Sequence, residues 1–203
     1  MPYTRDIVIL TKSAKHGGNC VAGIDVNTGE WVRPVKVRGP ILNSDMSCPN
    51  GYICKPLDVV RITFASQQPN GCQTENEEID TKSKWIYLDT WTLEDVLRIH
   101  PSENYTDIFG NYRCTLYEDE KSILSFSLML IKVSNLEFYT AEESGKTKAN
   151  FRYNGHRYSN MSVTDRDFFG CENTFNSGYL VMSIPNDTVP GYNYFKFVAK
   201  VFI

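Results

Sequence analysis

Hydrophobic and polar positions alternate with a period of two in several short stretches of this chain. Alternation of this kind indicates β-strands that bury one face and expose the other. The clearest stretch is 57–64, and Asn154-Gly155 is a strong turn signal that joins two further strands into a hairpin. The pattern predicts strands at 6–10, 20–26, 30–37, 57–64, 79–88, 122–139, 146–153, 157–163, 178–184 and 192–203.

One stretch has the pattern of a helix instead. Thr92 can cap the segment 92–99, and Pro101 follows its end. Glu94 and Asp95 fall in its first turn, where negative charge suits the helix dipole. We therefore expect one or two short helices in a chain that otherwise forms strands.

The predicted strands fall into two groups, separated by polar residues near 110–122. Short strands with closely spaced turns favour small barrels. A fold of alternating strands and helices would need several more helices than this chain offers. We predict an all-β protein of two small packed barrels, the first spanning residues 1–115 with a helical insertion near 92–99 and the second spanning residues 116–203.

The composition indicates a folded protein. The chain has 203 residues, of which 41% are hydrophobic and 13% aromatic, so it can fill a core. No apolar run approaches the roughly 18 residues that a membrane span needs, and the polar N-terminus does not resemble a secretory signal. We expect a cytoplasmic protein without membrane contact. The six cysteines include no C-x-x-C pair, so we expect no metal site.

The net charge is −3, but the charge is unevenly distributed. Residues 1–40 and 121–203 are net positive, whereas residues 41–120 are net negative. This distribution is compatible with a local surface for an anionic ligand. It is equally compatible with ordinary solvated faces.

Basic and aromatic side chains gather in the first predicted hairpin, 11–35. The basic side chains can contact phosphates, and the aromatic ones can stack on bases, which contributes roughly 1–3 kcal/mol per base. Gly17-Gly18 lets backbone amides approach an anion. The alternative is that the tryptophan belongs to the core and the lysines solvate a loop. The candidate residues are Lys12, Lys15, His16, Trp31 and Arg33.

Two amide side chains, Gln73 and Asn76, lie in a polar segment beside a predicted strand. Amides can read base edges because each carries a donor and an acceptor. Amides in loops also commonly bind their own backbone, so both readings stay open. The neighbouring glutamates, Glu75, Glu77 and Glu78, would repel phosphate and should point away from a nucleic-acid groove.

The second hairpin, 146–163, interleaves basic and aromatic residues. By alternation, Lys148, Asn150 and Arg152 share one strand face, and Ala149, Phe151 and Tyr153 share the other. This pattern predicts a basic outer face over an aromatic core. Lys148, Arg152 and Arg157 are the candidates there for following a nucleic-acid backbone.

Three blocks of the sequence together resemble the dual OB-containing domain family of prokaryotic genomes. The blocks are 11–35 (TKSAKHGGNCVAGIDVNTGEWVRPV), then 57–60 with 72–76 and Trp85, and finally 146–155 with Tyr158, 163–165 and the closing strands. They run in the expected order over nearly the whole chain, while 50–55 and 171–177 depart from the pattern. The resemblance implies two OB-like barrels and a role in nucleic-acid or nucleotide recognition, often near biological-conflict systems.

We therefore expect a non-catalytic module that recognises single-stranded nucleic acid or a nucleotide-like ligand, without a cofactor, in a prokaryotic conflict or defence system. Two alternatives remain: a protein–protein interaction module, and a nucleotide-processing enzyme with an unrecognised site. The chain has no nucleophile elbow, HExxH pair or deaminase zinc motif. Its three histidines are scattered along the sequence, which does not favour the enzyme.

Overall fold

The computed structural model describes residues 1–15, 17–188 and 193–203. Contacts divide the chain into two compact units, the first made of residues 1–70 and 75–101 and the second of residues 71–74 and 102–203. The sequence-based ranges, 1–115 and 116–203, placed residues 102–115 in the first unit. In the structure this segment belongs to the second unit because side chains of that unit bind its backbone: the Tyr153 hydroxyl donates to the Glu103 carbonyl at 3.0 Å.

The first unit is a ring of five strands with a sixth attached. β1 pairs with β2, β2 with β3, β3 with β5, β5 with β4, and β4 again with β1, so the ring closes. The β3–β5 pair is parallel and the other four pairs are antiparallel. β6 pairs with β4 outside the ring. The strands are β1 (Tyr3–Lys15), β2 (Gly18–Asp25), β3 (Trp31–Val35), β4 (Asp58–Gln67), β5 (Asn76–Ile79) and β6 (Ile86–Thr90).

The second unit is a closed barrel in the order β10-β13-β11-β8-β9. Here the β10–β13 pair is parallel and the other pairs are antiparallel. A small ladder of β7 (Thr115–Leu116) and β12 (Tyr194–Phe195) and two short helices, α2 (Glu118–Ser122) and η1 (Arg166–Phe168), complete the unit. The barrel strands are β8 (Leu128–Thr140), β9 (Thr147–Tyr153), β10 (His156–Val163), β11 (Thr174–Ser183) and β13 (Phe197–Phe202).

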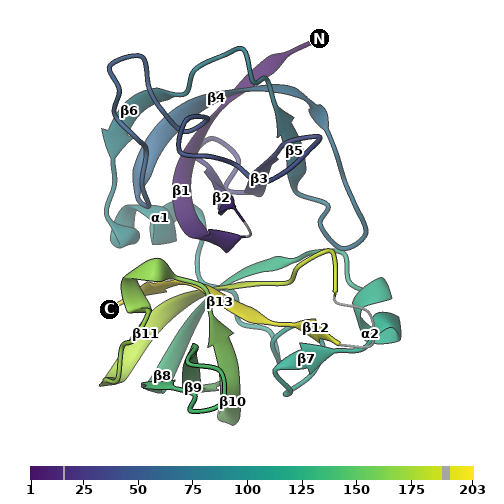
Figure 1. Ribbon diagram of the computed structural model, residues 1–203, viewed down its shortest axis with the longest axis vertical. Coiled ribbons are helices and arrows are strands. Elements are labelled where there is room, and N and C mark those ends of the chain that lie inside the picture. The colour runs from purple at the N-terminus through teal and green to yellow at the C-terminus, as the bar shows by residue number, and fades with distance from the viewer. Residues whose placement is uncertain (16, 189–192) are drawn as a thin grey trace. The chain divides into compact units, whose positions relative to one another are not determined.

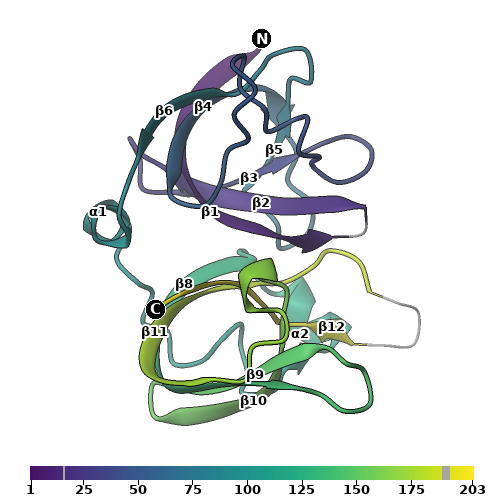
Figure 2. The ribbon, with the colours of Figure 1, turned by 60° about the vertical axis from the view of Figure 1, so that its left-hand side comes forward.

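Both units have the same topology (Figures 1 and 2). When the five ring strands of each unit are numbered along the chain, both rings read 1-2-3-5-4 and close back on strand 1, with strands 3 and 5 parallel. A closed five-stranded Greek-key barrel of this kind is the OB-fold. The predicted all-β class and the two OB-like barrels are confirmed.

Each barrel has its own hydrophobic core, supplied by the inward positions of its strands. In the first barrel Val60, Ile62 and Phe64 alternate along β4 and are fully buried. In the second barrel the rings of Phe151 and Tyr158 stack with their centroids 5.6 Å apart. Burial along β9 alternates as the sequence pattern predicted, with Ala149, Phe151 and Tyr153 inside.

The predicted helix is α1 (Leu93–Ile99) of the first unit. Thr92 caps it, and the side chains of Thr92 and Asp95 exchange hydrogen bonds with each other's backbone amides in a capping box. The connection between β3 and β4 contains no helix. The predicted strand at 122–139 begins only at Leu128, because residues 118–122 form α2.

Candidate ligand-binding site

The predicted binding residues of the first barrel are largely engaged within it. Arg33 on β3 is 3% exposed, and its Nε donates to Glu75 Oε1 at 2.9 Å. Its Nη1 lies 3.0 Å from the sulfur of Cys20. The Arg33 charge is therefore neutralised inside the barrel rather than displayed on its surface.

Trp31 and the two lysines of the first hairpin lie in different surroundings. The Trp31 ring meets the ring of His100 edge-on, with centroids 5.2 Å apart, and His100 Nδ1 lies 2.8 Å from the Gly29 carbonyl oxygen. Lys12 is half-buried on β1, and Lys15 is exposed at its end. His16 lies outside the described residues.

The two amide candidates, Gln73 and Asn76, are both buried, at 8% and 6% exposure. Gln73 Nε2 donates to the Ile184 carbonyl within the second unit at 3.0 Å. Asn76 lies on β5 of the first barrel, opposite Arg33 in the parallel β3–β5 ladder. The two amides therefore belong to different units.

The second barrel presents its basic residues outward. Lys148, Asn150 and Arg152 occupy the outer positions of β9, as the alternation predicted. Lys148 Nζ donates to Ser162 Oγ at 2.9 Å, and partial burial lowers the pKa of Lys148. Arg152 remains exposed and donates from Nη1 to the Gly155 carbonyl at 3.0 Å.

Arg152 and Arg157 are direct partners across the β9–β10 ladder. Within the described part of the chain neither guanidinium forms an ion pair, and Arg157 makes no side-chain hydrogen bond. Like charges placed opposite each other destabilise a sheet, so this pair is an electrostatic cost that an anionic ligand would relieve.

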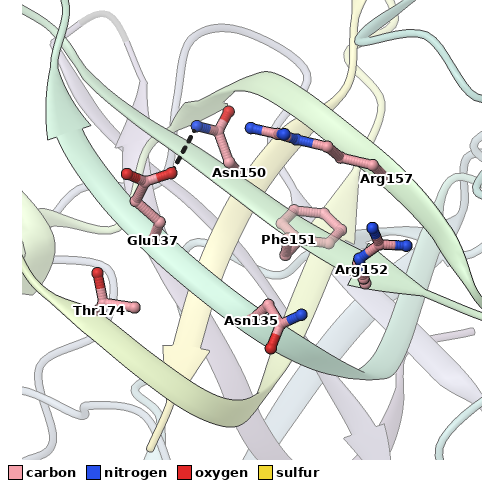
Figure 3. A pocket seen from close by; sticks show the side chains of 7 residues that line it. All are labelled: Asn135, Glu137, Asn150, Phe151, Arg152, Arg157 and Thr174. Carbon is pink, nitrogen blue, oxygen red and sulfur yellow. Dashed lines mark hydrogen bonds between the residues drawn. The ribbon is translucent and has the colours of Figure 1, made fainter.

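A hollow of about 340 Å³ lies beside this arginine pair on the outer face of the barrel (Figure 3). It is opened by a bulge in β8: Ser134 pairs with Arg152 and Glu137 with Asn150, so two residues of β8 oppose Phe151 alone. Asn135, in the bulge, has a φ of 52°. The lining residues are Asn135, Glu137, Asn150, Phe151, Arg152, Arg157 and Thr174.

Two polar side chains of the hollow, Asn150 and Glu137, are oriented by hydrogen bonds. The backbone amide of Asn160 donates to Asn150 Oδ1 at 3.0 Å, and Asn150 Nδ2 donates to Glu137 Oε2 at 2.9 Å. The sequence pattern did not indicate Asn135, Glu137 or Thr174 as site residues. The break that Ser134-Asn135 makes in a long β-prone run was the available signal for the bulge, but nothing local indicated that Thr174 on β11 completes the hollow.

Two OB-fold barrels, one with a hollowed polar face, define a tandem OB-fold protein, a class whose barrels bind ligands. The chain belongs to the dual OB-containing domain family, whose model matches residues 5–201. The resemblance inferred from the three sequence blocks is thus confirmed. Searches of curated proteins and of solved structures found no match.

Two features are absent from the described residues. Among them there is no group of three or more histidine, cysteine, aspartate or glutamate side chains arranged to hold a metal ion. None of the helices in the described ranges is long and apolar enough to cross a membrane.

Proposed function

We propose that this protein binds single-stranded nucleic acid through the outer face of β9 and β10 in the second barrel. The observation that carries the proposal is the cross-strand pair of Arg152 and Arg157 at the rim of a polar hollow. Strands β9 and β10 are the second and third strands of their barrel, and OB-folds bind oligonucleotides on the face of these two strands.

The chemistry of the arginine pair supports an extended polyanion as the ligand. Two uncompensated guanidinium groups on neighbouring strands can contact successive phosphates, and the release of counterions then drives binding. The net charge of the whole chain is −3, so attraction to nucleic acid has to come from a local surface of this kind.

Lys12 and Lys15 of the first barrel take a secondary part in the proposal. Both lie near the end of β1, which leads into the loop between the first and second strands. This loop is one of the two that OB-folds use for binding. The two lysines give the first barrel its own attraction for nucleic acid, whereas Arg33 contributes only to the structure of that barrel.

The test is fluorescence anisotropy with labelled single-stranded DNA and RNA at low salt, comparing the wild type with Arg152→Ala/Arg157→Ala. Loss of two phosphate contacts should weaken binding about tenfold or more and reduce the slope of log affinity against log salt by about 1.4, since each contact on a single strand contributes about 0.7. The double variant Lys82→Ala/Arg98→Ala removes the same charge from exposed positions of the first unit and serves as the control.

The control should bind within about twofold of the wild type, because salt screens the effect of exposed charges that lie away from the bound nucleic acid. Equal weakening by both double variants would mean that binding is diffuse and does not use the β9–β10 face. Absence of binding by the wild type to DNA and to RNA would refute the proposed function.

A further inference from the structure

The hollow beside the arginine pair contains a carboxylate that a site for phosphate alone would not include. Glu137 lines the hollow together with Arg152 and Arg157 but forms an ion pair with neither. Its Oε2 accepts the Asn150 amide at 2.9 Å, and its Oε1 has no hydrogen-bond partner among the described residues. An unneutralised carboxylate repels phosphate, so a ligand that occupies the hollow has to present a group of a different kind to Glu137.

An ionised carboxylate only accepts hydrogen bonds, and its two oxygens have about four lone-pair sites. In Glu137 one such site is occupied by Asn150, whose orientation is fixed because its own oxygen accepts the amide of Asn160. A ligand that binds the remaining sites must supply N–H or O–H donors. The two arginines require acceptors or negative charge, since guanidinium groups only donate.

Guanine is the nucleobase that meets both requirements. Its Watson–Crick edge carries two adjacent donors, N1–H and the N2 amino group, which match the two oxygens of a carboxylate. Its O6 and N7 are acceptors that suit an arginine fork. Adenine and cytosine each place a ring acceptor beside their amino group, and thymine places its one donor between two acceptors, so each would bring a lone pair against the carboxylate.

We propose that the hollow recognises a guanine base within the bound single strand, with Glu137 accepting hydrogen bonds from the Watson–Crick edge and Arg152 and Arg157 contacting the acceptors of the same nucleotide. A volume of about 340 Å³ lies at the lower end of the range for small-molecule pockets and suits one nucleotide unit rather than a longer segment. This inference rests on the proposed function and adds base selectivity to it.

The experiment uses three labelled thymidine 12-mers that carry one guanine, one inosine or one adenine at the centre. Inosine lacks only the N2 amino group, so it removes one donor to Glu137 and leaves O6 and N7 in place. The wild type should bind the guanine strand roughly 5- to 100-fold more tightly than the adenine strand, as for a bidentate base contact, with the inosine strand in between.

Glu137→Gln tests the role of the carboxylate while keeping an acceptor for the Asn150 amide. The variant should lose the preference for guanine and bind the adenine strand as tightly as the wild type or more tightly, because a negative charge is gone. Glu94→Gln, at an exposed position of α1 in the first unit, is the matched control and should keep the preference.

The outcomes separate the two proposals. If the wild type binds all three strands equally and Arg152→Ala/Arg157→Ala weakens them all, guanine recognition is wrong and the proposed function stands. If Glu137→Gln weakens all three strands equally, Glu137 supports the barrel instead of reading a base, and guanine recognition is again wrong. If no strand binds to the wild type, the proposed function fails and the selectivity fails with it.

Discussion

In the first barrel arginine side chains pair with carboxylates, whereas in the second barrel two arginines lie opposite each other in the β9–β10 ladder. Arg5 donates to Asp25 at 2.9 Å and pairs with Glu77 at 3.0 Å, and Arg33 pairs with Glu75. Arg33 and Arg157 both lie on the third strand of their barrel. The two barrels therefore share a strand order but differ in how their arginines are paired. Arg33 of the first barrel is neutralised by a carboxylate, whereas Arg152 and Arg157 of the second have no ion-pair partner among the described residues.

The bulges of the two barrels show the same contrast. Each barrel has an irregularity where its first strand pairs with its second, between Ile9 and Thr11 in β1 and between Ser134 and Glu137 in β8. In β1 the extra residue, Leu10, is fully buried. In β8 the bulge carries exposed Asn135 and opens the polar hollow. Both barrels have a bulge at this strand pairing, and the residue placed there is buried in the first barrel and lines a polar hollow in the second.

The largest effect should come from breaking the charge pair of the first barrel. Glu75→Ala leaves the buried guanidinium of Arg33 without its carboxylate, which should lower the free energy of unfolding by about 3–5 kcal/mol. Urea denaturation measures this loss. The exposed Glu94→Gln serves as the control and should stay close to the wild type.

Replacing both partners, in Arg33→Met/Glu75→Leu, should recover most of the stability lost in Glu75→Ala, because no buried charge remains. Anisotropy with single-stranded DNA should give the wild-type affinity for this double variant. A clear loss of affinity in the stable double variant would contradict the comparison, since it would place Arg33 in the binding surface.

The sequence was sufficient for the parts of the structure that local rules determine. The helix cap at Thr92, the hairpin over Asn154-Gly155 and the inward and outward faces of β9 are all as predicted. Asn154 and Gly155 have φ values of 47° and 79°, the left-handed conformation that a tight hairpin turn requires and that asparagine and glycine tolerate best. Each of these features depends on residues within a few positions of one another.

The features that the sequence did not reveal depend on residues far apart in the chain. Val32, Arg33 and Pro34 are all buried, so β3 does not alternate, and Arg33 is neutralised by Glu75 from a distant segment. The hollow combines the bulge in β8 with Thr174 of β11. Periodicity places a side chain on a strand face, but it does not reveal what a distant strand brings to that face.

A buried lysine in the second barrel extends the comparison, because its hydrogen-bond partners include no carboxylate. Lys196 is fully buried, and its ammonium donates to the carbonyls of Ile108 and Asn111 and to the Asn111 side chain. Burial lowers the pKa of Lys196 to about 7. Between about pH 7 and the ordinary lysine value of about 10.4 the unfolded chain therefore binds the additional proton.

Stability should accordingly rise with pH in this window and fall as the pH drops toward 7. The free energy of unfolding of the wild type relative to Lys196→Met should increase by up to about 1.4 kcal/mol per pH unit, measured by urea denaturation at several pH values. Taking the difference between the two proteins removes the contribution of other titrating groups. A difference independent of pH would show that the three acceptor oxygens keep the ammonium charged.

The smallest effect should come from the arginine pair itself, and its sign is the most informative. Arg157→Ala removes a like charge directly opposite Arg152 and breaks no hydrogen bond of the described chain. It should raise the free energy of unfolding by about 0.2–1 kcal/mol, seen as a slightly higher Tm at low salt that disappears at high salt as the repulsion is screened. The same variant should bind single-stranded nucleic acid less tightly. A higher Tm together with weaker binding would mean that Arg157 serves the ligand at a cost to the barrel. A lower Tm would instead assign Arg157 to the structure of the second barrel, as Arg33 is to that of the first barrel.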